Sequence, residues 1–266
     1  MRYAQLVMGP AGCGKSTYCA TIVRHAETLR RKVHVVNLDP AAEVFDYEPL
    51  ADIRELIHID DVTEASDLQL GPNGGLVYCL EYLIQNLDWL EEQLGEVDDD
   101  YILIDCPGQI ELYTHVPVMP KLIKTLDSWN FRLCGVFILD TTFMLEASKF
   151  FSGTLVALST MVNTNIPHVN VLSKMDLLNR TNKQRVESFL DPDHHLLDDE
   201  PAGANKWNRK FYQLSKKIAS VVENYSLVRF LPLDITDEGS IDDVLCTIDI
   251  NLQYGEDAEV YDRYPE

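Results

Sequence analysis

The residues best suited to chemistry lie near the start of the chain, where positions 9–16 read GPAGCGKS. Glycines at this spacing let backbone N–H groups converge on a phosphate group, and the N-terminus of a following helix favours the same negative charge. Lys15 is expected to bind the β- and γ-phosphates, and the Ser16 hydroxyl is expected to bind Mg²⁺. The expected nucleotide-binding residues of this loop are Gly12, Cys13, Gly14, Lys15, Ser16 and Thr17.

The same loop has a simpler interpretation as a glycine-rich turn before a helix. A pattern of two glycines, a lysine and a serine arises by chance in roughly one chain in a hundred of this length. Here an apolar run at residues 6–8 precedes the loop, and helix-compatible residues 17–22 follow it. This order of strand, loop and helix favours a phosphate-binding loop over a plain turn.

A second polar group follows the apolar run at residues 101–104. Asp105, at the end of this expected strand, could bind Mg²⁺ directly or through water. The Gly108 amide suits a γ-phosphate, and the Gln109 side chain can orient an attacking water. An ordinary turn is the alternative, but the position downstream of a phosphate loop favours a segment that senses the nucleotide.

Two further carboxylates are candidates for placing the water. Asp39 precedes Pro40 after an expected strand, so it either faces the phosphates or caps a turn. Glu111 stands two residues after Gln109 and is either a second polar group beside the water or an acid that faces solvent. No arginine in these segments is obviously placed to stabilise the charge of a transferring phosphoryl group.

A third motif, Ser173, Lys174, Met175 and Asp176, follows the apolar run at residues 169–172. It resembles the Asn-Lys-x-Asp motif with which GTPases recognise their base. Asp176 can accept two hydrogen bonds from guanine that adenine cannot offer, and the Lys174 stem can lie along the base. Ser173 replaces the usual Asn, which weakens a supporting hydrogen bond. A helix cap is the alternative role for Asp176.

The elements that must position these residues alternate along the chain. Apolar runs predict strands at residues 6–8, 33–36, 101–104, 133–139, 169–172 and 228–231. The expected helices are residues 15–30, about 74–94, about 116–129, 145–163, 207–224 and 240–252. This alternation predicts an α/β fold with a doubly wound, mainly parallel sheet, which binds ligands at the carboxyl ends of its strands.

The chain length suits one domain of this kind. Residues 1–253 are expected to form a single P-loop NTPase domain with inserted helical segments. The segment at residues 40–73 is long and acidic. The segment at residues 191–206 is rich in turn-forming residues and is expected to be an exposed insertion. Residues 254–266 are expected to form a loosely ordered tail.

The composition excludes several classes of function. The 43 acidic and 22 basic residues give a net charge of -21, which repels nucleic-acid backbones and anionic membranes. The six cysteines include no CxxC pair, which argues against zinc and disulfide frameworks and for a reducing compartment. The N-terminus lacks a signal-peptide pattern, and no apolar run reaches transmembrane length. We therefore expect a cytoplasmic protein that could also shuttle to the nucleus.

The residues Gly71, Pro72 and Asn73 lie between the phosphate loop and the segment after Asp105. Alone, this sequence is a good turn. Together with the three motifs above, in this order, it makes the chain resemble the GPN-loop GTPases over nearly all of residues 1–253. The resemblance implies that Asn73 acts in the active site of a neighbouring subunit, near the γ-phosphate. It also implies a homodimer or heterodimer with another GPN-loop GTPase and a role in the assembly and nuclear import of RNA polymerase II.

The main hypothesis is a Mg²⁺-dependent GTPase with Lys15, Asp39, Gln109, Glu111 and the neighbour's Asn73 as catalytic residues. A small-molecule or polynucleotide kinase could use the same loop, but the sequence shows no arginine cluster for the lid that such kinases need. A nucleotide-dependent scaffold or chaperone-like binding module with negligible hydrolysis stays open. In such a module, marginal geometry at the active site would make hydrolysis very slow.

Overall fold

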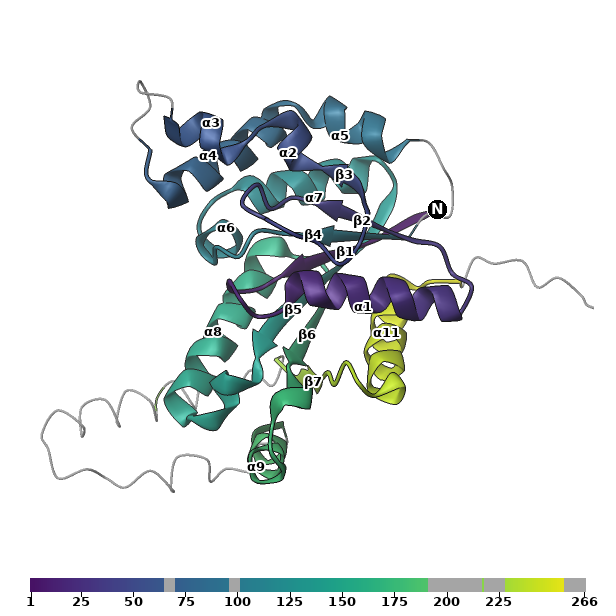
Figure 1. Cartoon of the computed structure of the whole chain (residues 1–266), viewed down its shortest axis with the longest axis vertical. Coiled ribbons are helices and arrows are strands. Elements are labelled where there is room, and N and C mark those ends of the chain that lie inside the picture. The colour runs from purple at the N-terminus through teal and green to yellow at the C-terminus, as the bar shows by residue number, and fades with distance from the viewer. Residues whose placement is uncertain (65–69, 96–100, 191–216, 218–227, 256–266) are drawn as a thin grey trace, which may run out of the picture.

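Seven parallel strands form one sheet in the order β3-β2-β4-β1-β5-β6-β7 (Figure 1). The computed structural model describes residues 1–64, 70–95, 101–190, 217 and 228–255. The strands are β1 (Arg2–Met8), β2 (Val33–Asn37), β3 (Pro49–Asp52), β4 (Tyr101–Asp105), β5 (Phe131–Asp140), β6 (His168–Ser173) and β7 (Phe230–Pro232). β1 lies between β4 and β5, so the ends of these three strands meet at one edge of the sheet.

Helices cover both faces of the sheet (Figure 1). α1 (Lys15–Thr28) and α11 (Glu238–Leu252) pack on one face. The other face is covered by α4 (Pro72–Gln85), α5 (Leu87–Leu94), α7 (Val118–Ser128) and α8 (Ala147–Thr164). The shorter elements are α2 (Ile53–Leu56), α3 (Ile59–Glu64), α6 (Glu111–Thr114), α9 (Arg180–Leu190) and the 3-10 turns η1 (Thr141–Leu145) and η2 (Met175–Leu177). This arrangement confirms the predicted doubly wound α/β fold.

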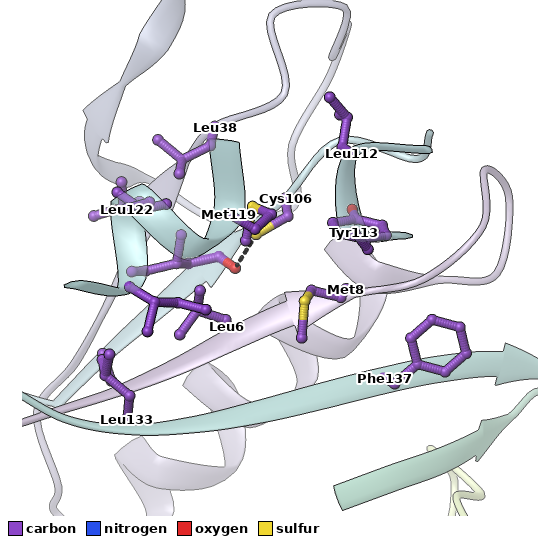
Figure 2. Packing of buried hydrophobic residues seen from close by; sticks show 14 of the residues in the cluster. Leu6, Met8, Leu38, Cys106, Leu112, Tyr113, Met119, Leu122, Leu133 and Phe137 are labelled. Atoms are coloured by element: carbon purple, nitrogen blue, oxygen red, sulfur yellow. Dashed lines mark hydrogen bonds between the residues drawn. The ribbon is translucent and has the colours of Figure 1, made fainter. Parts of the chain in front are cut away.

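Alternate residues of the central strands build two separate hydrophobic cores. In β1, Leu6 and Met8 pack into the core on the α7 side, and Val7 packs into the core on the α1 side. Figure 2 shows Leu6 and Met8 beside Met119 and Leu122 of α7. Because both faces of each strand are buried, the strands read as continuous apolar runs in the sequence. The two cores fix the strand ends where the polar motifs begin.

The six predicted strands are all present, as β1, β2, β4, β5, β6 and β7. The seventh strand, β3, lies within residues 40–73, where we predicted no strand. The single helix predicted over about 74–94 is two helices, because the backbone leaves the helical conformation at Asn86, with φ -125° and ψ 42°. α9 was also absent from the prediction.

Some sequence predictions fall on parts of the chain that the structure does not describe. The insertion at residues 191–206 lies outside the described residues, as does the predicted helix at 207–224 apart from residue 217. The predicted loose tail differs at its start, because the Tyr254 ring packs edge-on against Tyr3 and Tyr101 at centroid distances of 4.9 and 5.3 Å. Among the described helices, none has both the length and the apolar composition of a membrane span.

Candidate nucleotide-binding site

The loop between β1 and α1 has the backbone that phosphate binding requires. Gly12 and Gly14 have φ of 74° and 94°, in the left-handed region that residues with side chains rarely adopt. Gly14 directly precedes α1, so Lys15 and Ser16 lie in the first turn of that helix. The Lys15 side chain is buried, and its Nζ donates to the Pro10 carbonyl oxygen at 3.3 Å. The loop therefore holds a positive charge beside free helix N–H groups, which suits an anion.

The loop after β4 packs directly on the phosphate loop. A Cβ atom on Gly108 would lie 2.7 Å from the Ala11 Cα, so only glycine allows this approach. The next residue, Gln109, lines the pocket beside the phosphate loop. Its Oε1 is buried and has no hydrogen-bond partner among the described residues. Since a buried unpaired acceptor is costly, this oxygen is suited to binding a water or ligand proton.

Asp105, the last residue of β4, lies buried in the same site. Burial raises the pKa of its carboxyl, although hydrogen bonds from Ser16 and Tyr47 act in the opposite direction. The Tyr47 hydroxyl donates to Oδ2 at 2.9 Å, whereas Oδ1 has no partner in the described part of the chain. A buried, unpaired carboxylate oxygen near a serine hydroxyl offers the oxygen ligands that Mg²⁺ prefers. Asp105 and Ser16 therefore fit a magnesium ion.

Asp39 caps a turn and also lines the pocket beside the phosphate loop. Its Oδ1 accepts a hydrogen bond from the Ala41 backbone N–H at 3.0 Å, so it caps the turn after Pro40. Asp39 also lines the same pocket as Lys15. The Asn37 side chain fixes the Asp39 backbone, accepting from its N–H at 3.0 Å and donating to its carbonyl oxygen at 3.1 Å. The carboxylate is thus held at the pocket by a rigid turn.

The end of β6 is bonded to the phosphate loop through Ser173. Its hydroxyl oxygen lies 2.6 Å from the Cys13 carbonyl oxygen and 3.2 Å from the Leu139 carbonyl oxygen. Ser173 therefore still bonds to the phosphate loop, and a weaker support than that of an asparagine stays a prediction. The strand end lies close enough to the loop for a short side chain to make the bond.

Lys174 forms a second link between these two loops. Its Nζ donates to the Gly12 carbonyl oxygen at 2.7 Å and forms an ion pair with Asp140 Oδ2 at 2.5 Å. Partial burial opposes ionisation of Asp140, but the hydrogen bonds from Lys174 and Thr142 outweigh it and hold the pKa of Asp140 below its usual value. Two residues further on, Asp176 lies in η2, and no described side chain pairs with its carboxylate.

The three motifs surround one pocket of about 490 Å³. Its lining residues are Ala11, Gly12, Gly14, Lys15, Ser16, Thr17, Asp39, Ala41, Gly108, Gln109 and Lys174. Seven predicted site residues lie outside this lining: Cys13, Asn73, Asp105, Glu111, Ser173, Met175 and Asp176. Glu111 is the first residue of α6, Asp176 follows Met175 in η2, and Asn73 is exposed near the start of α4. The exposure of Asn73 leaves it accessible to another molecule.

Sequence reasoning missed two polar residues of this site. Asp140 ends β5, and an acid at the end of an apolar run was the same signal that identified Asp39 and Asp105. That signal could therefore have found it. Tyr47 lies between β2 and β3 in a segment without periodic pattern, and only the folded chain brings it to Asp105.

Comparisons with known proteins agree with this geometry. A family model described as a conserved hypothetical ATP binding protein matches residues 7–254. Proteins named GPN-loop GTPase 3 from Danio rerio and Xenopus tropicalis are 58% and 57% identical to this chain, over 97% of it and 90% of each relative. A crystal structure of a GTPase in apo form from Pyrococcus abyssi has the same fold, with a TM-score of 0.71 at 24% identity over 95% of this chain and 98% of that one. The chain therefore belongs to the GPN-loop GTPases, a family of GTP hydrolases.

Proposed function

We propose that this chain binds GTP with Mg²⁺ in the pocket described above and hydrolyses it as a switch that acts in a dimer. The observation that carries the proposal is the convergence of three motifs, distant in sequence, on one pocket at the carboxyl ends of parallel strands. The hydrogen bonds from Ser173 and Lys174 to the phosphate loop make the base-binding and phosphate-binding parts one unit.

The residues at the phosphate end of the pocket have different roles. Lys15 and the loop amides bind the β- and γ-phosphates. The phosphates then replace the Pro10 carbonyl oxygen as the hydrogen-bond acceptor of Lys15. Ser16 and Asp105 would hold the magnesium ion. When bound, this ion would neutralise charge on the β- and γ-phosphate oxygens. The Gly108 backbone lies against the phosphate loop, where its N–H can reach the γ-phosphate.

The attacking water is oriented by Gln109, whose buried Oε1 lacks a partner among the described residues. Asp39 lines the same pocket and provides a second acceptor for the water's hydrogen bonds. Glu111, the first residue of α6, lies outside the pocket lining; as the second residue after Gln109 it is the further carboxylate that we assign to the water. The reaction needs positioned acceptors more than a strong base, because phosphoryl transfer depends mainly on placement and charge.

The base is selected by Asp176 and Lys174. The Asp176 carboxylate accepts from the N1–H and the amino group of guanine, and an adenine base would leave it unpaired. The Lys174 stem lies along the base while its Nζ remains bonded to Gly12 and Asp140. Guanine preference therefore rests on the Asp176 carboxylate, which no described side chain binds and which follows the fixed Lys174.

Purified protein tests this proposal through phosphate release and calorimetry with GTP and ATP. We expect GTP to bind at least about a hundredfold more tightly than ATP. Lys15→Ala should weaken GTP binding by about 3 kcal/mol, because it removes the buried charge that faces the phosphates. Gln109→Leu should bind GTP normally and hydrolyse it at least about tenfold more slowly, because the water loses its orienting group.

Lys121→Ala, an exposed lysine on α7, is the matched control and should behave as the wild type. Equal affinity for GTP and ATP, or full hydrolysis by both site variants, would contradict the proposal. GTP binding with no hydrolysis in wild-type dimers would instead support a nucleotide-dependent scaffold.

The dimer part of the proposal rests on the family and on the position of Asn73, exposed next to Pro72 of α4 and outside the lining of its own pocket. A neutral amide from the neighbouring subunit would stabilise the γ-phosphate in a pocket whose described lining contains no arginine. Asn73→Ala should lower hydrolysis by about a hundredfold with little effect on GTP affinity.

Mixing variants tests whether Asn73 acts in the neighbouring subunit of a homodimer. The Asn73→Ala protein keeps an intact pocket, and the Lys15→Ala protein keeps an intact Asn73. If the residue acts across the interface, mixed dimers should regain hydrolysis that neither variant has alone. Failure of the mixture, with normal dimers in both variants, would place Asn73 in its own subunit or outside the reaction.

Family membership also supports a role in the assembly and nuclear import of RNA polymerase II, with its subunits as clients and the cytoplasm as the main location. The net charge of -21 suits protein partners better than direct contact with nucleic acid or membranes. Depletion of the protein from cells should leave polymerase II subunits in the cytoplasm. Unchanged nuclear import after depletion would refute this part of the proposal.

A further inference from the structure

Residues 38–48 form neither helix nor strand, yet they bring Asp39 to the pocket and Tyr47 to Asp105. We propose that Arg54 is a positioning residue for GTP hydrolysis, because it holds these residues, here called the Asp39 segment, against β3 and α2. The inference rests on the role given to Asp39 in the proposed function. It concerns how that carboxylate is kept in place.

Arg54 contacts the middle of the Asp39 segment directly. Its Nη1 donates to the Ala42 carbonyl oxygen at 2.8 Å and reaches the Glu43 carbonyl oxygen at 3.4 Å. Its guanidinium carbon lies 4.6 Å from the centre of the Phe45 ring, within the range of a cation–π contact. One side chain thus binds three residues of a segment that belongs to no helix or strand.

The contact continues from Phe45 to the metal-binding carboxylate. The Phe45 and Tyr47 rings stack with centroids 4.9 Å apart and an angle of 23° between their planes. The Tyr47 hydroxyl then donates to Asp105 Oδ2 at 2.9 Å. A displacement of Phe45 would therefore shift the hydroxyl that orients Asp105.

Arg54 is itself fixed by a buried acid. Its Nη2 and Nε lie 2.5 and 2.9 Å from Asp52 Oδ2, and the Asp52 side chain is only 9% exposed. Asp52 Oδ1 also accepts from Asn37 Nδ2 at 2.9 Å. Asn37 is the residue that holds the Asp39 backbone from both sides. The start and the middle of the Asp39 segment are therefore held by one hydrogen-bonded network around Asp52.

This network also defines what Arg54 does not do. Its N–H groups are directed to Asp52 and to the carbonyl oxygens of Ala42 and Glu43, so the guanidinium is not available to a phosphate. Only a planar fork can donate in these directions at once, and a lysine in the same place cannot. Arg54 is thus a structural anchor for a catalytic segment and not a charge-stabilising arginine.

The test variant is Arg54→Lys, examined by amide hydrogen exchange and by single-turnover GTP hydrolysis. Exchange reports local opening without requiring activity, and we expect it to quicken by about tenfold within residues 39–48. The hydrolysis rate should fall by about tenfold, since displacement of a positioned group by an ångström is enough for such a loss. The affinity for GDP should change by less than about twofold, because Lys15 and the loop amides stay in place.

Arg31→Lys is a closely matched control. Arg31 forms a two-pronged pair with Asp249, at 2.6 and 3.2 Å, and its guanidinium lies over the Tyr101 and Tyr254 rings. It follows the C-terminus of α1, about 20 Å along that helix from the phosphate loop. We expect this variant to lose similar stability while its hydrolysis rate and the exchange of residues 39–48 remain those of the wild type.

If Arg54→Lys does not fold, Phe45→Leu is the second variant, because it removes only the ring between Arg54 and Tyr47. Wild-type exchange in residues 39–48, or a hydrolysis rate equal to that of Arg31→Lys, would overturn the inference. The variant Asp39→Asn distinguishes a failure of this inference from a failure of the proposed function. A slow Asp39→Asn protein beside a fast Arg54→Lys protein refutes only the anchor, whereas a fast Asp39→Asn protein refutes the role of Asp39 itself.

Discussion

The side chain of Lys174 links the end of β6 to the phosphate loop and to the end of β5. A lysine in a base-binding motif is expected to use its apolar stem against the base. Here its ammonium group also binds the Gly12 carbonyl oxygen and the Asp140 carboxylate. The charge is satisfied within the protein, so it adds nothing to the attraction of phosphate. We expect these bonds to keep the stem in one position before a nucleotide binds, which would lower the entropy cost of binding.

Asp140→Asn tests this role of the ion pair. Without the carboxylate, Lys174 loses its ion pair and keeps the bond to the Gly12 carbonyl oxygen, so its stem is held less firmly in one rotamer. We expect the dissociation constant for GDP to rise by about tenfold, which corresponds to about 1.4 kcal/mol. Inorganic phosphate or pyrophosphate should bind as in the wild type, since neither ligand touches the base site. Titration calorimetry with GDP and with pyrophosphate measures both effects.

The control for Asp140→Asn is Glu146→Gln, which removes an acid from an exposed pair with Lys149 at 2.8 Å. Exposed pairs contribute little, so GDP affinity should stay unchanged in that variant. Equal losses of GDP and pyrophosphate affinity in Asp140→Asn would mean that the ion pair supports the phosphate loop and not the base site.

At the scale of elements, the parallel sheet explains why the site could be predicted. A strand buried on both faces is visible as an apolar run, and its carboxyl end is where a ligand can approach. Polar residues that directly follow such runs are therefore strong candidates for function. Asp105 and Lys174 were identified in this way, and Lys15 from the residue spacing of the phosphate loop that follows β1. The structure brings all three residues close to that loop.

The elements that the sequence did not predict lack this local signal. β3 has only four residues, begins with Pro49, and ends the sheet at one edge. The division between α4 and α5 occurs at Asn86, without a glycine or proline to mark it. Arg54 belongs to the same class, since a single arginine gains its meaning from carbonyl oxygens that only the folded loop presents. Such features depend on tertiary contacts and have no periodic pattern in the chain.

For the whole molecule, the two cores have different polar content. The core on the α1 side contains a chain of buried hydrogen bonds that runs from Tyr18 through Gln5 to Tyr101 and Asp249. Each group in that chain has a partner, as buried polar groups require. On the α8 side, His168 lies in the sheet with both ring nitrogens buried and without a partner among the described residues. Its ring occupies the space left by Gly135 of β5, where a Cβ would lie 2.5 Å from Nδ1.

This histidine makes the stability of the whole fold depend on pH. Burial lowers the pKa of His168 from 6.5 to about 4, so the folded protein binds its proton more weakly than the unfolded chain does. Protonation therefore favours unfolding: the contribution is complete above pH 6.5 and is lost as the pH falls toward 4. The interval between these pKa values corresponds to about 3 kcal/mol.

His168→Phe, which keeps a ring beside Phe137, should remove this part of the pH dependence. Urea unfolding at several pH values between 4.5 and 7.5 measures it, and the exposed His58→Gln is the control. The free energies of unfolding of wild type and His168→Phe should diverge as the pH falls, because only the wild type retains the titrating ring. A constant difference across this range would show that the buried ring does not govern the acid sensitivity of the fold.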